Sequence, residues 1–338
     1  MKLISKKMVK MVALAVAMAL IAGCGGEAKK EAPKAADSSK KKVTVGIVQL
    51  VEHPALDAAN KGFVEGLASR GYKEGQNITF DRQNAQADQS NLQTIAQRFV
   101  NNKDNLICAI ATPAAQTVAN ATKDIPIVGT AITDYEQAKL VKSNAKSGTN
   151  VTGTSDMNPI KEQIDLLLKI VPNCKTIGYI YSSSEVNSQI QVNEAKKYAE
   201  SKGIKAVEAT VSTVNDIQQA AHSLVGKCEA IYIPTDNVLA SAMPTLSAIT
   251  NEAKLPVICG EGNMVKAGGL ATLGIDYHKL GYQAGLMAAD ILDGKRKVQN
   301  MGIETQKEFQ VIVNEEVAQK LGVKIPEDIL KKAKEGKK

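Results

Sequence analysis

From residue 43 onward, short apolar runs rich in β-branched residues alternate with longer segments of helical period. The first group of runs is VTVGIVQL (43–50), NITFDRQ (77–83), NLICAIAT (105–112), IPIVGTAI (125–132) and VTGTSD (151–156). A second group follows with KTIGYIYS (175–182), KAVEATV (205–211), EAIYIP (229–234), LPVICG (255–260) and LATLGI (270–275). Strands that alternate with helices form parallel sheets covered on both faces. We therefore predict an α/β protein with two doubly wound, Rossmann-like lobes.

The two groups resemble each other in detail. The first helix of each ends in a small basic turn, SRGY or SKGI, whose glycine is a typical helix C-cap residue. A helix over 277–292 and a strand over 309–314 follow the second group. We therefore expect three crossings between the lobes. Lobe 1 would comprise 43–155 plus about 277–305, and lobe 2 would comprise 156–276 plus about 306–338.

The amino terminus has the composition of a secretory signal. Its first ten residues carry four lysines and no acid, and the next twelve, MVALAVAMALIA, carry no charge. That apolar stretch is shorter than the roughly 20 residues of a membrane-spanning helix. It ends at Ile21-Ala22-Gly23-Cys24, which resembles the bacterial lipobox. We expect residues 1–23 to be removed and Cys24 to carry lipid, palmitate included; the alternative is an ordinary signal with an incidental cysteine.

Residues 24–42 are rich in Gly, Ala, Ser, Pro and charge, and such a segment cannot bury enough apolar surface to fold. We predict a lipid-anchored flexible tether at the extracytoplasmic face of the cell membrane. Removal of residues 1–23 lowers the net charge from +7 to +3, with 38 basic and 35 acidic side chains. The basic excess lies in the tether and the tail, which argues against a nucleic-acid partner.

Polar segments follow most of the predicted strands, where parallel sheets bind ligands. They are QLVEHPA, ATPAAQT, TAITD, TSDMNP, YSSSEVNS, IPTDNVLAS and GIDYHK. Because they come from both lobes, we predict that they form two walls of one cleft. Helix capping is the alternative for Ser155, Asp156 and Asn187.

The succession VEHPALDAA, IATPAAQT, ITD, NVTGTSD, YSSSEVNSQ, PTDN and GIDYHKLG, together with the lipobox, resembles the substrate-binding lipoproteins of ABC importers. The resemblance covers nearly all of residues 43–320 and is to the family associated with tryptophan and other aromatic amino acids. It implies the type I periplasmic-binding-protein fold, with a three-segment hinge and a cleft that closes on the solute. It also implies a permease and an ATPase as partners.

A zwitterionic amino acid needs donors for its carboxylate and an acceptor for its ammonium group. For the carboxylate we expect the hydroxyls of Ser183, Ser184 and Ser188 and the backbone of the helix start at Thr112, Ala114 and Ala115. For the ammonium group we expect Asp236 or Asp276. Further candidates are Gln49, Asp134, Glu185, Asn187 and Asn237. Tyr181 would stack on an aromatic ligand or pack at its strand end.

The chain has no Trp and only four Phe, and Phe63, Phe80, Phe99 and Phe309 all fall in predicted elements of the core. Aromatic stacking would therefore depend on Tyr, or the pocket would be aliphatic. His53 precedes Pro54 at a helix start, and a ligand contact is the alternative for it.

Sequence signatures of catalysis are missing. The chain contains no GxSxG, HExxH, GxxxxGK[ST] or CxxC motif, and its three histidines are scattered. We therefore expect a monomeric binding protein without cofactor or metal. Two alternatives remain: a ligand-sensing lipoprotein that reports to a membrane receptor, and a membrane-anchored α/β hydrolase.

Cys174 and Cys228 each stand three residues before an isoleucine that begins a strand. In the doubly wound order the first and third strands of a lobe are neighbours. An exported location permits disulfides, so we expect one between these two residues.

Overall fold

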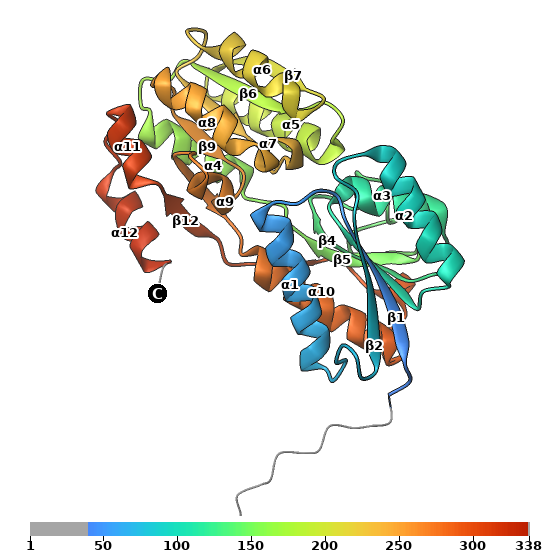
Figure 1. The fold of residues 1–338 in the computed structure, drawn as a ribbon. Helices are drawn as coiled ribbons and strands as arrows, with labels where there is room; N and C mark the ends of the chain where they lie inside the picture. Colours follow the sequence, from blue (N-terminus) through green and yellow to red (C-terminus); the bar gives the residue numbers. More distant parts are fainter. Residues whose placement is uncertain (1–39, 337–338) are drawn as a thin grey trace, which may run out of the picture. The chain divides into compact units, whose positions relative to one another are not determined.

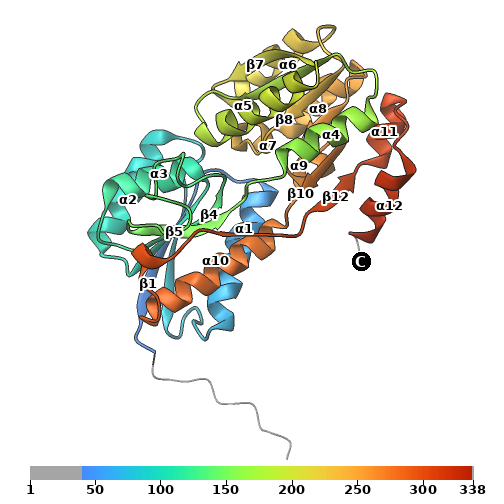
Figure 2. The same ribbon diagram turned by 180° about the vertical axis from the view of Figure 1, so that it is seen from behind.

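The computed structural model describes residues 40–336, which belong to one compact unit. They form two six-stranded sheets, each covered by helices (Figures 1 and 2). Lobe 1 is the first sheet with its helices, and lobe 2 is the second sheet with its helices. The expected signal sequence, Cys24 and nearly all of the tether lie outside the described residues.

Lobe 1 contains a fully parallel sheet in the order β11-β5-β4-β3-β1-β2. Its strands are β1 (Val43–Gln49), β2 (Ile78–Asn84), β3 (Leu106–Ile110), β4 (Ile127–Ile132), β5 (Val151–Ser155) and β11 (Glu304–Thr305). Its helices are α1 (Pro54–Ser69), α2 (Gln89–Asn102), α3 (Thr112–Ala121) and α10 (Tyr277–Leu292). The five strands expected from the apolar runs are confirmed, whereas the two-residue strand β11 was not expected.

Lobe 2 has the strand order β12-β10-β9-β8-β6-β7. Its strands are β6 (Thr176–Ser182), β7 (Lys205–Val211), β8 (Ala230–Ile233), β9 (Val257–Cys259), β10 (Ala271–Gly274) and β12 (Gln310–Val313). Its helices are α4 (Ile160–Ile170), α5 (Val186–Ser201), α6 (Ile217–Leu224), α7 (Asn237–Ser241), α8 (Met243–Glu252), α9 (Gly262–Lys266), α11 (Glu315–Leu321) and α12 (Glu327–Glu335). The expected order, with the first and third strands as neighbours, is confirmed by the pairing of β6 with β8.

One strand of lobe 2 departs from the expected parallel arrangement, because β12 runs antiparallel to β10. The chain leaves β10 at its carboxyl end and later returns beside that same end. Gln306 marks the return point, since its side chain accepts from Asp276 N at 3.2 Å and donates to Asp276 O at 2.6 Å. A strand that begins there must run opposite to β10.

The three expected crossings between the lobes are present. They lie after β5, between β10 and α10, and between β11 and β12. Phe309 belongs to the last crossing and is 39% exposed, so the expectation that it is a core residue was wrong. A linking segment does not enter either core, and an aromatic side chain there remains at the surface.

Helices α1 and α10 approach each other through glycines, although they are far apart in the sequence (Figure 1). A Cβ atom added at Gly62 would lie 2.1 Å from His278 O, and one added at Gly281 would lie 1.9 Å from Ala59 O. Real side-chain carbons do not come so close to backbone. Glycine is therefore required where these two helices cross.

Cys174 and Cys228 are free thiols in the structure, so the expected disulfide is not present. Each Sγ instead lies 3.5 Å from a different backbone oxygen, Thr176 O for Cys174 and Leu224 O for Cys228. Neighbouring strands place the two residues on one edge of the sheet, but the side chains turn to separate carbonyl groups.

Candidate functional site

Side chains at the carboxyl ends of the two sheets bond to each other across the lobes. His53 Nε2, between β1 and α1, lies 3.2 Å from Asn237 Oδ1 on α7. Gln191 Nε2 on α5 donates to Thr133 Oγ1, after β4, at 3.1 Å. Both contacts are buried. The expected arrangement, in which the polar segments of both lobes face each other, is present in these contacts.

A cavity of about 650 Å³ adjoins this region and takes its walls from both lobes. Part of the lining is apolar, contributed by Leu50, Val51, Leu92 and Pro113 of lobe 1 and by Val214 and Val238 of lobe 2. Polar groups complete it, among them Ser184 and Glu185. Among residues 40–336, no aromatic side chain lines this cavity. The apolar lining residues lie in loops or near the start of a helix. The sequence interpretation missed them because it selected polar groups at the strand ends.

Glu185 lies at the centre of the polar network of lobe 2 and is 2% exposed. Its Oε1 accepts from Asn237 N at 3.1 Å and from Val238 N at 3.2 Å, and its Oε2 accepts from the side-chain amides of Asn187 and Asn237. Burial, and then the nearby Asp236, raise the pKa of Glu185 to about 8, whereas the N–H donors act in the opposite direction. Because all of these partners are N–H donors, both oxygens act as acceptors.

Asp236 is also buried, and its carboxylate accepts three hydrogen bonds from its own lobe. Oδ2 accepts from Ser182 N at 2.6 Å and from Ser188 Oγ at 2.7 Å, and Oδ1 caps α7 by accepting from Leu239 N at 2.9 Å. Burial raises the pKa of Asp236, against these donors. The ligand contacts expected of Asp236 and Ser188 remain predictions, and in the structure these two side chains bond to each other.

Asp276, the second candidate for the ammonium group, caps α10 by accepting from Lys279 N at 3.1 Å. It lies at the crossing between the lobes and does not line the cavity. Asp134 likewise holds its own loop, since it accepts from Glu136 N at 2.9 Å and from the side chain of Asn144 at 3.1 Å. Both residues are therefore structural in their described contacts.

Three more expected contacts point elsewhere. Gln49 donates to Asp57 Oδ1 at 2.6 Å and so fixes α1 to β1. Tyr181 Oη donates to Glu208 Oε2, at 2.9 Å, on the neighbouring strand β7. Ser183 bonds through both its N and its Oγ to Val211 O. Sequence reasoning placed these residues at strand ends correctly, but side-chain direction was decided by partners from other elements.

The remaining expected residues stay beside the cavity. Ser184 and Glu185 line it, and Thr112, Ala114 and Ala115 form the first turn of α3 next to Pro113. Asn187 and Asn237 are buried and bind Glu185.

Several buried polar atoms in this region have no hydrogen-bond partner. They are His53 Nδ1 and Thr112 Oγ1 in lobe 1 and Asn187 Oδ1 in lobe 2. Their residues are 6%, 2% and 4% exposed. Buried polar atoms are nearly always hydrogen-bonded in folded proteins, so a group of unpaired ones beside a cavity marks a place for a polar ligand.

The backbone at this end of lobe 1 is strained. Ala111, which precedes α3, has φ 86° and ψ 153°, a conformation adopted almost only by glycine. Ala131, at the irregular end of β4, has φ 56°. Strain of this kind costs about 1–3 kcal/mol for each residue and is concentrated at binding sites. Here the strained residues are the one directly before α3 and the one two positions before Thr133.

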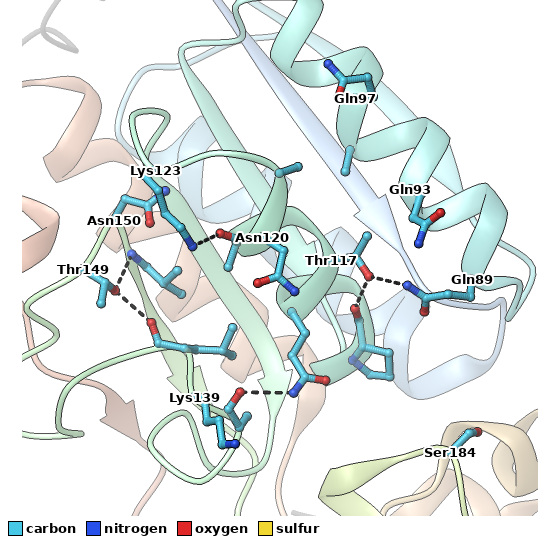
Figure 3. A pocket seen from close by; sticks show the side chains of 18 residues that line it. Gln89, Gln93, Gln97, Thr117, Asn120, Lys123, Lys139, Thr149, Asn150 and Ser184 are labelled. Carbon is cyan, nitrogen blue, oxygen red and sulfur yellow. Dashed lines mark hydrogen bonds between the residues drawn. The ribbon is translucent and has the colours of Figure 1, made fainter.

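A second hollow lies on lobe 1 between α2, α3 and the loop before β5 (Figure 3). Its polar lining includes Gln93, Asn120, Lys123 and Asn150, and among its lining residues Ser184 alone comes from lobe 2. Several of these side chains already bond within lobe 1; Asn150 Nδ2, for example, donates to Ile125 O at 2.9 Å. Closure of the two lobes would not enclose a ligand there, so the interlobe cavity is the better candidate.

In the range 40–336, no group of three or more His, Cys, Asp or Glu side chains is placed to hold a metal ion. Nor does any helix within it have the length and apolar character needed to cross a bilayer.

Comparisons with known proteins agree with this architecture. A family model described as ABC transporter substrate binding protein matches residues 44–337. A tyrosine-binding protein of Clostridioides difficile is 46% identical over 322 residues, which cover 94% of this chain and 92% of the relative.

Two of the solved structures that match over most of this chain are more than 40% identical to it. One is a domain from Streptococcus pneumoniae in complex with L-Trp, with 41% identity and a TM-score of 0.84, covering 87% of this chain and 99% of that one. The other is the ligand-free, open structure of a Clostridium difficile substrate-binding protein with adhesive properties. It has 48% identity and a TM-score of 0.66, and covers 85% of this chain and 97% of that one.

Proposed function

The chain belongs to the family of ABC transporter substrate-binding proteins, and on that premise we propose that it captures an aromatic amino acid between its lobes. The observation that carries this proposal is the composition of the interlobe cavity. Apolar walls come from both lobes, and buried polar atoms that lack partners lie in the chain segments next to the lining residues. A zwitterion with a large apolar side chain needs both kinds of surface, because its charged end must be hydrogen-bonded once water is removed.

The relatives support the same ligand class. One is named for tyrosine binding, and another was crystallised with L-Trp. The cavity of about 650 Å³ lies within the range of about 300–1,000 Å³ that is usual for small-molecule sites. Since aromatic residues are missing from its lining, the aromatic ring of the ligand would pack against aliphatic side chains such as Leu92 and Val238.

Ligand binding would be coupled to closure of the two lobes. Only when the lobes are together do residues of both walls contact one solute, so the ligand favours the closed form. The closed protein would then deliver its ligand to a permease driven by an ATPase. This role needs binding without turnover, which separates it from the hydrolase alternative.

A thermal-shift screen of the twenty amino acids tests the ligand class. L-Trp or L-Tyr should raise the melting temperature, since a ligand at about 100 times its Kd stabilises the folded state by about 2.7 kcal/mol. The chain contains no Trp, so the fluorescence of bound L-Trp can be followed without background from protein tryptophan. Recovery of the ligand unchanged by mass spectrometry tests for turnover. A response to aliphatic or charged amino acids alone would contradict the proposal.

We further propose that Cys24 carries a lipid anchor and that residues 24–42 are the tether. The support is the sequence Ile21-Ala22-Gly23-Cys24 after a basic and then an apolar stretch. A Cys24→Ala variant should lose incorporation of labelled palmitate and pass from the membrane fraction into the medium or periplasm. Cys174→Ala is the matched control and should remain membrane-bound. Equal labelling of Cys24→Ala would contradict the assignment.

A sensing role would use the same cavity, so binding data alone do not separate it from import. Deletion of the gene should abolish uptake of labelled L-Trp or L-Tyr if the protein feeds an importer. Unchanged uptake together with an altered transcriptional response to the same amino acid would favour the sensor instead.

A further inference from the structure

His53 is the residue of lobe 1 whose buried ring reaches lobe 2. Its Nε2 lies 3.2 Å from Asn237 Oδ1, while its Nδ1 is buried and has no partner. The ring follows β1 and comes just before Pro54, which begins α1. It therefore stands at the carboxyl edge of the sheet, where ligands of α/β proteins bind.

The second lobe determines which nitrogen of this ring carries the proton. Glu185 Oε2 accepts from the side-chain amide of Asn237, so the NH₂ group of Asn237 must face Glu185. The Oδ1 of Asn237 then faces His53, and a carbonyl oxygen can only accept. The proton of a neutral His53 is therefore on Nε2, and Nδ1 is left as a bare acceptor.

A bare acceptor that is almost fully buried needs a donor from another molecule. Asn187 Oδ1 is in the same condition, because its NH₂ group is used by Glu185 Oε2 and by Thr235 O at 3.0 Å. The side-chain amides of Asn187 and Asn237 thus both donate to Glu185 Oε2. One unpaired acceptor is Asn187 Oδ1 itself, and the other is Nδ1 of His53, the ring that contacts Asn237. An ammonium group, with three donors, has the chemistry to meet several such acceptors.

We propose that His53 Nδ1 accepts a hydrogen bond from the ammonium group of the bound amino acid, with the ring held in the required tautomer by Asn237 and Glu185. This inference rests on the proposed function and gives a definite role to His53, for which the sequence left a ligand contact open as an alternative. It also replaces Asp236 as the expected ammonium partner, since that carboxylate is already satisfied.

Acid should then release the ligand. A second proton on the ring turns Nδ1 into a donor and adds a positive charge beside the ammonium group, so binding is present above the pKa of the ring and lost below it. Burial lowers the pKa of His53, against the bond to Asn237 and the charge of Asp57 on α1. Other acidic groups near the ring are Glu52, the preceding residue, and Glu185 and Asp236, beyond Asn237.

Two variants separate the contacts of the ring. His53→Asn offers an oxygen near the former Nδ1 position but is too short to reach Asn237. His53→Gln reaches toward Asn237 but offers no acceptor at the δ position. Affinity for L-Trp and L-Tyr would be measured by calorimetry on the mature full chain from about pH 7.5 to about pH 5. We expect His53→Gln to weaken binding at least about tenfold, with His53→Asn clearly less affected and less dependent on pH than the wild type.

An analogue of tyrosine without its amino group provides the direct test of the partner. If His53 binds the ammonium group, His53→Gln should weaken L-Tyr but leave the affinity for the analogue unchanged. Equal losses for L-Tyr and for the analogue would overturn the assignment, and so would an affinity of His53→Gln for L-Tyr within about twofold of the wild type.

The ring state can be measured independently of any ligand. The chain has three histidines, so nitrogen NMR can assign each ring. The ligand-free protein should show His53 protonated on Nε2, and L-Trp should shift Nδ1. An Nδ1–H tautomer would overturn the inference. The wild type could show the expected tautomer and yet bind neither aromatic amino acid. That result would contradict the proposed ligand class, whereas the assignment of His53 Nδ1 as an unprotonated acceptor would be confirmed.

Discussion

Thr133 and Gln191 are separated by 58 residues and belong to different lobes, yet Gln191 Nε2 donates to Thr133 Oγ1 at 3.1 Å. Both residues are almost completely buried, at 2% and 0% exposed. Gln191 is held in turn by Thr235, whose backbone N donates to Gln191 Oε1 at 3.2 Å. The bond therefore ties the end of β4 to the polar network of lobe 2.

Thr133→Val keeps the shape of the side chain but removes the bond that Thr133 Oγ1 donates to Asp156 Oδ1 at 3.0 Å as well as this bond from Gln191. We expect the affinity for L-Trp or L-Tyr to fall by about five- to tenfold, because a buried hydrogen bond contributes about 1 kcal/mol and this one exists only when the lobes are together. Calorimetry measures the change. Thr152→Val is the matched control, since Thr152 Oγ1 donates to Gly302 O within lobe 1. An equal loss of affinity in both variants would contradict a role in closure.

Asp236 should prove structural. Asp236→Asn places an NH₂ group among donors from Ser182, Ser188 and Leu239, so we expect the free energy of unfolding to fall by about 3 kcal/mol. Ser188→Ala removes only one of the donors and should cost about 1 kcal/mol. Urea unfolding measures both. Unchanged stability of Asp236→Asn, combined with a large loss of affinity, would instead place this carboxylate on the ligand.

Asp104 is a buried carboxylate without a partner. It is 4% exposed, neither oxygen has a hydrogen bond, and a Cβ added at Gly46 would lie 2.6 Å from its Oδ2. Burial, and then Asp81, raise the pKa of Asp104 to about 6, while Arg98 acts to lower it. The folded state thus binds this proton more tightly than the unfolded chain, in which the pKa is about 3.9. The contribution of protonated Asp104 to the stability of the folded state is greatest below about pH 4 and is lost as the pH rises through about 6.

Asp104→Asn should therefore stabilise the protein at about pH 7.5 by about 1–2 kcal/mol, after allowance for solvent screening, and the gain should disappear near pH 4. Urea unfolding at the two pH values measures this difference. Asp124→Asn, at an exposed position, serves as the control and should change little at either pH. A gain of the same size at both pH values would show that the amide acts by packing rather than by removing a charge.

Gly281→Ala should be strongly destabilising, because the added carbon meets Ala59 O at 1.9 Å and both partners are helix backbone. We expect a loss of about 3 kcal/mol in the free energy of unfolding, at the upper end of the usual range for overpacking. Gly336→Ala is the control, since its nearest atom would be 3.6 Å away, and it should change stability by less than about 0.5 kcal/mol. Similar behaviour of the two variants would contradict the close approach of α1 and α10.

The agreement between sequence and fold is closest where the signal is local. The run TIGYIYS becomes β6, and the helix expected over 277–292 is α10 with the same limits. Apolar periodicity and punctuation by glycine and proline act within a few residues, so they can be recognised without the tertiary structure. Strand β11 was not predicted because a strand of two residues is too short to show an alternation of apolar and polar positions.

The candidate site agrees less well, and the serine-rich segment after β6 illustrates the reason. Of its hydroxyls, Ser188 serves Asp236, Ser183 faces Val211 O, and Ser184 lines the cavity. All three have the same chemistry and similar positions after one strand. What separates them is the partner that each meets from another part of the chain.

The sequence alone thus determined two α/β sheets, three crossings between them and polar groups at the facing strand ends, because these follow from patterns shorter than a helix. Only the tertiary structure decided which polar atoms remain unpaired. Asp236 is satisfied by residues 48 and 54 positions away, whereas His53 Nδ1 is left free by a chain of bonds that begins at Glu185 in the other lobe. Hydrogen-bond capacity is a property of the residue, but its use depends on neighbours that folding brings from distant parts of the sequence.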